Sequence, residues 1–255
     1  MSGRLVALTH APSPAIEQGE RTHRPRLPID FDRALRQHES YRRLLAECGC
    51  EVQLLAANRD FPDGVFIEDT AVVLDEVAVL ATMGAASRRG EPAGVEPVLR
   101  RYRTVRRLEP PATLEGGDVL RVGRTLLVGH SQRTNAAGIA ALAEIARDHG
   151  YSVRPVPVRG CLHLKSACSA LPDGRLLVDS ARVDREALSG FPLVPVSEAE
   201  AANALLVGET VVLAAAFPRT AALVRSLGFA VRTVDLSEFA KAEGAVTCLS
   251  LIFPP

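Results

Sequence analysis

VLRVGRTLLV, residues 119–128, contains two apolar runs separated by Gly123-Arg124, and this pattern predicts a β-hairpin. An amphipathic segment follows at 135–149, with apolar residues at helical spacing. Gly150 then stands where a helix C-cap is expected, and a further apolar strand starts directly after it. The stretch therefore predicts a unit of two strands, one helix and a third strand.

The same unit recurs about five times, at a period of roughly 40–50 residues that is in the range of propeller-like folds. Hairpins are expected at 70–80, 167–178 and 204–213, helices at 31–48, 91–101, 183–189 and 218–227, and glycines leading into strands at Gly49, Gly190 and Gly228. A fifth strand, 102–108, lacks the glycine. Small mixed sheets around an axis, closed by the N-terminal strand Arg4–Leu8, are therefore predicted. A doubly wound sheet is the weaker alternative, because strands and helices do not alternate strictly and no G-x-G-x-x-G follows the first strand.

The helix expected at 31–48 should turn Leu35, Tyr41, Leu44 and Leu45 inward. The segment 9–28 contrasts with it, because it is polar and carries four prolines, which exclude a helix or a central strand. Loops of this length in a compact domain are often lids, so 9–28 is predicted to be one.

Bulk composition predicts one domain spanning 1–255. Hydrophobic residues make up 47% of the chain and its net charge is zero, so neither disorder nor a general affinity for nucleic acid is expected. The start of the chain does not resemble a signal peptide, and no apolar run is long enough to span a membrane. Five scattered cysteines without a C-x-x-C spacing favour the reducing cytoplasm and give no support for structural zinc. No cofactor, metal or membrane partner is expected, and a homodimer is left open.

The residues that could perform chemistry share one position in each repeat, between the first strand and the hairpin. They are Asp63, Glu68 and Asp69, then Glu115 and Asp118, then His163, Asn203 and Cys248. If the units surround an axis, this shared register brings them toward one end of it. A thiol, an imidazole and several carboxylates together favour nucleophilic attack on the carbon of a planar guanidinium or amidinium cation.

Several of these residues also allow a different interpretation. Glu68 and Asp69 are adjacent, so in a strand they would face opposite ways, and Asp69 is the better candidate for a ligand contact. Asp118 and Asn203 precede their turns by the same offset and are expected to be structural. A metal cluster of Cys161, His163 and Cys168 is disfavoured because the spacing matches no common zinc pattern.

Four stretches resemble the dimethylarginine dimethylaminohydrolases of the guanidino-modifying, or pentein, superfamily. They are Pro62–Ala71 (PDGVFIEDTA), Leu114–Val119 (LEGGDV), Leu162–Ser166 (LHLKS) and Val246–Cys248 (VTC), joined by GHSQRTN at 129–135. The resemblance runs over nearly the whole chain. It implies a five-bladed pseudo-symmetric α/β propeller of ββαβ units and hydrolysis of methylated arginine to citrulline and methylamine or dimethylamine.

The resemblance also implies roles for individual residues. Cys248 would be the nucleophile and His163 the general acid and base, with Glu115 and Asp69 holding the guanidinium. The substrate carboxylate would bind Arg88 and Arg133 and its α-amino group Asp63. Ser166 and Glu243 would lie beside the site in supporting roles, and Glu68 is kept as a further substrate-binding candidate.

His163-Leu164-Lys165 separates this chain from arginine and agmatine deiminases, which commonly carry His-x-Asp there. Without that carboxylate, one guanidinium nitrogen lacks its acceptor, and methyl groups on it cost little desolvation. Hydrolysis of another alkylguanidine, or of arginine itself, stays an alternative. So does a non-catalytic propeller that binds a partner, although such a protein would not need the cysteine, histidine and acidic set.

Overall fold

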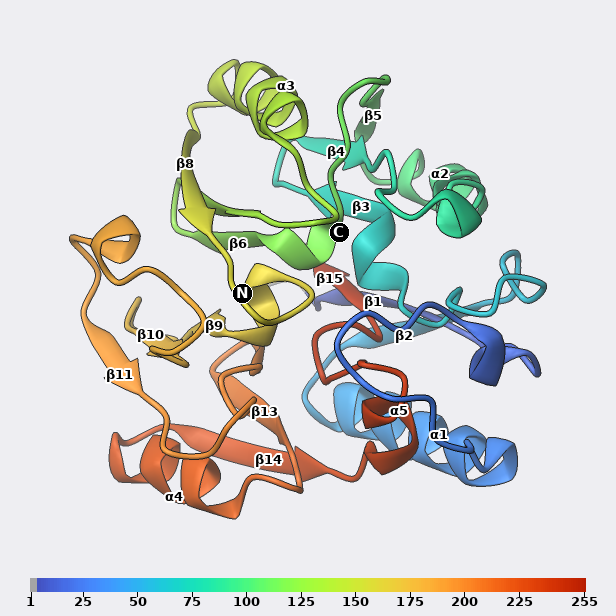
Figure 1. The fold of residues 1–255 in the computed structure, drawn as a ribbon, viewed down its shortest axis with the longest axis vertical. Coiled ribbons are helices and arrows are strands. Elements are labelled where there is room, and N and C mark those ends of the chain that lie inside the picture. The colour runs from blue at the N-terminus through green and yellow to red at the C-terminus, as the bar shows by residue number, and fades with distance from the viewer. Residues whose placement is uncertain (1–3) are drawn as a thin grey trace.

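In the computed structural model, which describes residues 4–255, five three-stranded sheets surround a central axis (Figure 1). Helices lie on the outside of the ring (Figure 1): α1 (Phe31–Glu47), α2 (Glu91–Leu99), α3 (Ala136–Arg147) and α4 (Pro218–Ser226). This arrangement confirms the predicted five-bladed α/β propeller.

Each blade combines an antiparallel hairpin with a third, parallel strand. In the blade of β6 (Val119–Val122), β7 (Thr125–His130) and β8 (Ser152–Pro157), α3 connects the last two strands. The same order is seen in β3 (Ala71–Val73), β4 (Val77–Leu80) and β5 (Thr104–Arg107); β9 (Cys168–Ala170), β10 (Leu176–Val178) and β11 (Leu193–Pro195); and β12 (Leu205–Val207), β13 (Thr210–Ala214) and β14 (Ala230–Val234).

The remaining blade joins the two ends of the described chain. β1 (Val6–His10) pairs antiparallel with β15 (Leu251–Phe253) and parallel with β2 (Glu51–Leu55). β1 is buried along its whole length, as a central strand should be. The predicted closure by an N-terminal strand is confirmed, two residues further along than the sequence suggested.

The helix predictions are largely confirmed, with local corrections. The glycine that follows α1, Gly49, has φ +93°, which fits its predicted role at the helix end. Leu35 was wrongly placed inward and is 41% exposed, because the buried stripe of α1 runs through Ala34, His38 and Tyr41 instead. The helix expected at 183–189 is only a 3-10 turn, Glu186–Leu188, and the short helix α5 (Ser237–Ala240) was not predicted.

Three 3-10 turns meet near the axis, each directly before the first strand of its blade: Ile67–Thr70, Gly116–Asp118 and Leu164–Ser166. Two glycines allow this close approach. A Cβ at Gly116 would lie 2.1 Å from the carbonyl oxygen of Glu68, and one at Gly117 would lie 2.7 Å from His163 Nδ1. The glycine pair in LEGGDV is therefore a requirement of backbone packing, and it brings the turns and their side chains together.

The segment 9–28 runs irregularly after β1, apart from the 3-10 turn Ile16–Gln18. None of the helices in residues 4–255 combines the length and the apolar character that a membrane span requires.

Candidate active site

Glu115 and His163 form the centre of the site. His163 Nε2 lies 2.7 Å from Glu115 Oε2, and both side chains are buried. The amide of Gly84 donates to the other carboxylate oxygen at 3.0 Å. Burial alone would lower the pKa of His163, but the charge of Asp69 and the hydrogen bond to Glu115 outweigh it and raise the pKa to about 9. Burial alone would raise the pKa of Glu115, but the hydrogen bond to His163 and the charges of His163 and nearby arginines hold this pKa below its usual range. At neutral pH the imidazole is therefore charged.

Asp69 lies on the other side of the imidazole ring, its Oδ1 atom 3.8 Å from His163 Nδ1. That oxygen also accepts the amide of Gly117 at 3.1 Å. Its second oxygen binds Arg88 Nη1 at 2.7 Å. The imidazole therefore stands between two carboxylates, and both of them are oriented by further donors.

Arg88 is buried, and most of its N–H donors have partners within the protein. Nε and one terminal nitrogen bind Glu91 at 3.0 and 2.8 Å, and the latter also donates to the carbonyl of Phe66 at 3.1 Å. Arg88 thus orients Asp69 in this structure. Its expected contact with a substrate carboxylate stays a prediction.

Glu68 points away from the imidazole. The residue lies in the 3-10 turn Ile67–Thr70, before the first strand of its blade, so the alternation of side chains along a strand does not apply to it. Its carboxylate binds Lys165 Nζ at 2.6 Å and the Thr247 hydroxyl at 2.8 Å. Asn203 accepts the amide of Thr247 and donates to the Lys165 carbonyl, so it braces the backbone on both sides of the site.

Cys248 comes from the connection between α5 and β15, and it is half-buried. The amide of Ala245 donates to its sulfur at 3.4 Å. Burial, together with the charges of Glu68 and Asp69, raises the pKa of the Cys248 thiol to about 12. The resting nucleophile is therefore a thiol, and an added positive charge nearby would favour the thiolate.

Most of the sequence-predicted residues line one narrow catalytic cavity of about 20 Å³, and Glu115 lies just behind it, against His163. The lining residues among them are Asp63, Asp69, Arg88, Arg133, His163 and Cys248. Arg133 is held loosely, with one nitrogen 3.4 Å from Glu115 and another 3.4 Å from the Thr22 hydroxyl. Glu243 lies in the wall of this cavity, whereas Ser166 faces a neighbouring cavity. Asp118 accepts the amide of Leu164 at 2.9 Å, a structural contact next to His163.

The segment 9–28 covers the catalytic cavity. Its Glu20 amide donates to Asp63 at 2.9 Å, and the amides of Thr22 and His23 both donate to the Glu243 carboxylate at 2.6 Å. Glu243 itself has φ +61°, a conformation that residues with a side chain rarely adopt. The segment is thereby attached to opposite walls of the cavity.

Sequence reasoning missed Glu91 and the contacts that Glu20 and Thr22 of the segment 9–28 make with Asp63 and Glu243. A buried acid three residues after Arg88 on the next helix is a signal that could have pointed to Glu91. The contacts of Glu20 and Thr22 are made by backbone amides, which any residue except proline could supply, so the sequence does not reveal them.

Asp69, Glu115 and His163 offer ligand atoms within 4.8 Å of one another, a spacing that a metal ion could use. However, Arg88 already neutralises Asp69 and Arg133 lies beside Glu115, so positive charge is present where a divalent cation would add more. A planar organic cation adds only one positive charge and can also donate N–H groups to these carboxylates, so it fits the site better than a divalent metal ion.

Known proteins give the context for this geometry. A profile described as eukaryotic N,N dimethylarginine dimethylhydrolase matches residues 20–167. An N(G),N(G)-dimethylarginine dimethylaminohydrolase of Streptomyces coelicolor is 42% identical over 96% of this chain and 95% of its own, and that of Pseudomonas aeruginosa is 37% identical over 88% and 90%.

Solved structures agree with the sequence relatives. The Pseudomonas aeruginosa enzyme, as a cysteine-to-serine variant with citrulline, superimposes with a TM-score of 0.91 and 33% identity over 99% of this chain and 100% of its own. The N-terminal domain of ArgZ, a cyanobacterial arginine dihydrolase, shares the fold with a TM-score of 0.85 at 23% identity, covering 97% of each chain. The chain therefore belongs to the dimethylarginine dimethylaminohydrolase family.

Proposed function

We propose that this protein hydrolyses N-omega-methylated arginine to citrulline and methylamine or dimethylamine, with Cys248 as the nucleophile. The observation that carries this proposal is the grouping of a thiol, an imidazole and the Asp69 carboxylate on one cavity, with the Glu115 carboxylate hydrogen-bonded to the imidazole from behind. The relatives' names and the citrulline complex of the Pseudomonas enzyme support the same reaction.

Recognition of the substrate begins with its charge. A guanidinium offers planar N–H donors, and Asp69 and Glu115 are the carboxylates beside the imidazole that would accept them. The positive charge of the substrate lowers the free energy of the Cys248 thiolate. Without substrate, the negative charges of Glu68 and Asp69 disfavour the thiolate. The substrate thus activates its own nucleophile.

The chemistry takes two steps. The Cys248 thiolate forms a bond to the guanidinium carbon, the bond from this carbon to the methylated nitrogen breaks, and His163 gives its proton to the departing amine. A covalent thiouronium remains. His163 then takes a proton from water, the oxygen adds to the same carbon, and the carbon–sulfur bond breaks to release citrulline and restore the thiolate.

The amino-acid end of the substrate would lie toward Arg133, Asp63 and Arg88. Arg133 has two long contacts of 3.4 Å, so it is available for a carboxylate. Asp63 accepts a lid amide with one oxygen, which leaves the other for an ammonium group. Glu243 and Ser166 support the lid and the neighbouring wall.

We further propose that residues 1–255 act as a single catalytic domain in the cytoplasm, with 9–28 as its lid and without a metal. The five cysteines are unpaired, which fits a reducing compartment. The zero net charge gives no reason to expect nucleic acid as a partner. Sedimentation of the pure protein decides between monomer and homodimer.

The test is a substrate panel of asymmetric dimethylarginine, monomethylarginine, arginine and agmatine, with citrulline or its decarboxylated analogue as the readout. The wild type should release citrulline from the methylated substrates far faster than from arginine. Cys248→Ser should lose nearly all turnover, while Cys48→Ser, a change at another half-buried free cysteine, should not. Faster turnover of arginine would favour a deiminase instead.

A further inference from the structure

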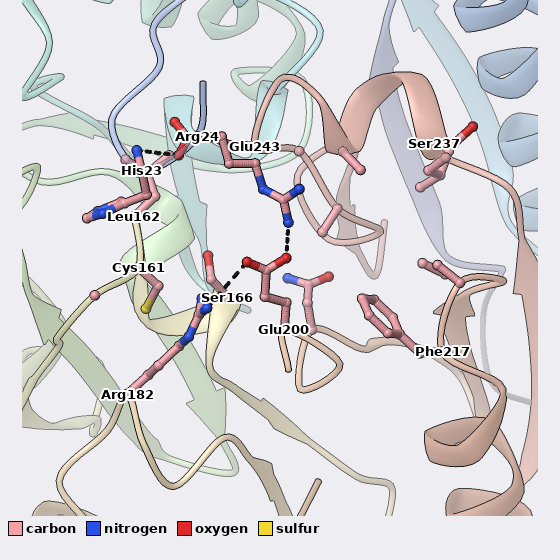
Figure 2. Close-up of a pocket in the computed structure, with 18 of the residues that line it drawn as sticks. His23, Arg24, Cys161, Leu162, Ser166, Arg182, Glu200, Phe217, Ser237 and Glu243 are labelled. Atoms are coloured by element: carbon pink, nitrogen blue, oxygen red, sulfur yellow. Dashed lines mark hydrogen bonds and ion pairs between the residues drawn. The ribbon is translucent and has the colours of Figure 1, made fainter. Parts of the chain in front are cut away.

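Figure 2 shows a second cavity, here called the side chamber. It shares lining residues with the catalytic cavity. It has a volume of about 190 Å³ and is partly open to solvent, and its lining includes Cys161, Ser166 and Phe217. His23 and Arg24 of the lid segment form part of its boundary (Figure 2). None of the steps proposed above uses this space.

The two cavities share a thin wall. Leu162, Glu243 and Gly244 line both of them. Ala245 lines the side chamber, and its amide lies 3.4 Å from the sulfur of Cys248. The chamber therefore begins one loop away from the reacting sulfur.

The proposed reaction needs a second route through the protein. After the first step the amino-acid part stays attached to Cys248 beneath a lid that is bonded to both Asp63 and Glu243. The amine must leave and a water molecule must enter before the thiouronium can be hydrolysed. The path by which the substrate came in is blocked by the intermediate itself.

The side chamber suits a small alkylammonium ion. Its lining combines apolar side chains such as Leu162, Phe217 and Leu236 with the carboxylates of Glu200 and Glu243. Glu243, on the shared wall, accepts two backbone amides and forms no ion pair with an Arg or Lys side chain among residues 4–255. A methylated amine has methyl groups for the apolar part and, once protonated, a charge for Glu243, whereas Glu200 is already paired with Arg24 and Arg182.

The outer side of the chamber carries an ionic bridge. Glu200 contacts Arg24 from the lid and lies 3.3 Å from Arg182 (Figure 2). Its backbone has φ +68°, where glycine would be less strained. The Glu200 carboxylate links Arg24 of the lid segment to Arg182 on the other side of the chamber. The Glu200 side chain is 36% exposed, so this bridge lies at the boundary with solvent.

From these features we propose that the side chamber carries the alkylamine out and hydrolytic water in while the lid is closed, with the Arg24–Glu200–Arg182 bridge as its outer gate. This inference rests on the proposed function. It adds a binding site for small alkylammonium ions that is separate from the guanidinium site.

The test uses amine exchange during turnover. Isotope-labelled dimethylamine from solution should enter the chamber, attack the thiouronium and return as labelled dimethylarginine, which mass spectrometry detects. Ala216→Trp fills the chamber from an exposed position on its lining, and Ala215→Trp is the matched control, exposed but outside the lining. Glu200→Gln removes the charge of the gate without adding bulk.

Ala216→Trp should lower both exchange and dimethylarginine turnover about tenfold, because release of product then limits the rate. Monomethylarginine, whose leaving amine is smaller, should be affected less, and Ala215→Trp should match the wild type. Glu200→Gln should raise exchange severalfold. Wild-type exchange in both Ala216→Trp and Glu200→Gln, or equal losses for both substrates, would overturn the proposal. A wild type that makes no citrulline from methylarginine would instead reject the proposed function.

Discussion

Replacing Asp69 with asparagine should change the reactivity of Cys248 in opposite directions toward neutral and cationic reagents. Asp69 is one of two carboxylates whose charge, added to burial, raises the pKa of this thiol to about 12. The same carboxylate would attract a cation into the site. Asparagine keeps an oxygen to accept the amide of Gly117, so the local turn should survive.

The size of the effect follows from one lost charge. A like charge close to a titrating group shifts its pKa by about one to two units, so the thiolate fraction at pH 7.5 rises about tenfold per unit. Thiolate nucleophilicity falls about threefold per unit, which leaves a net gain of about three- to tenfold for neutral iodoacetamide. Chloroacetamidine loses its carboxylate partner and should react about tenfold more slowly.

The assay is alkylation of Cys248 by the two reagents, followed by mass spectrometry across a pH series. Asp63→Asn is the control, because this carboxylate lines the same cavity but is not a main cause of the thiol's raised pKa. If both reagents speed up together, or both slow down together, Asp69 does not act through charge and the electrostatic account of the site is wrong.

Two further results are expected. Arg133→Ala should raise KM for methylarginine about 10- to 100-fold through loss of a charge-assisted contact, but it should change agmatine kinetics far less; equal effects on both would make Arg133 structural. Burial, with the charge of Arg42 and the nearby His10, lowers the pKa of His38 to about 3. Above about pH 3 the folded protein keeps this ring neutral, whereas in the unfolded chain the ring is protonated below its ordinary pKa of about 6.5. The free energy of unfolding should therefore fall by up to about 1.4 kcal/mol for each pH unit between about 6.5 and 3. His38→Leu should flatten this slope in urea titrations, and an unchanged slope would show that His38 is not its source.

The sequence predicted the propeller because its signals are local. Turn residues such as Gly123 and helix-ending glycines such as Gly150 determine hairpins and caps without help from distant residues. Once the units surround an axis, their shared register places Glu115 and His163 together, and the structure finds them 2.7 Å apart. The prediction that Leu35 faces the core failed because helical periodicity does not distinguish well between neighbouring positions. The packing of α1 against the rest of the protein buries Ala34 and leaves Leu35 exposed.

Features that depend on packing between distant segments were beyond the sequence. Arg88 turns toward Asp69 because Glu91 is buried beside it, which residue type alone does not reveal. The lid is held through amides of Thr22 and His23, and any residue could supply those. The side chamber arises between segments from several blades, so no single motif predicts it.

The central claim is that the sulfur of Cys248 bonds to the guanidinium carbon. Rapid acid quench of turnover on methylarginine, followed by peptide mass spectrometry, measures this directly. A thiouronium adduct is expected on the peptide that carries Cys248, and Cys248→Ser should lose both this adduct and the activity. Citrulline production by that variant, or turnover that never leaves an adduct on this cysteine, would contradict it.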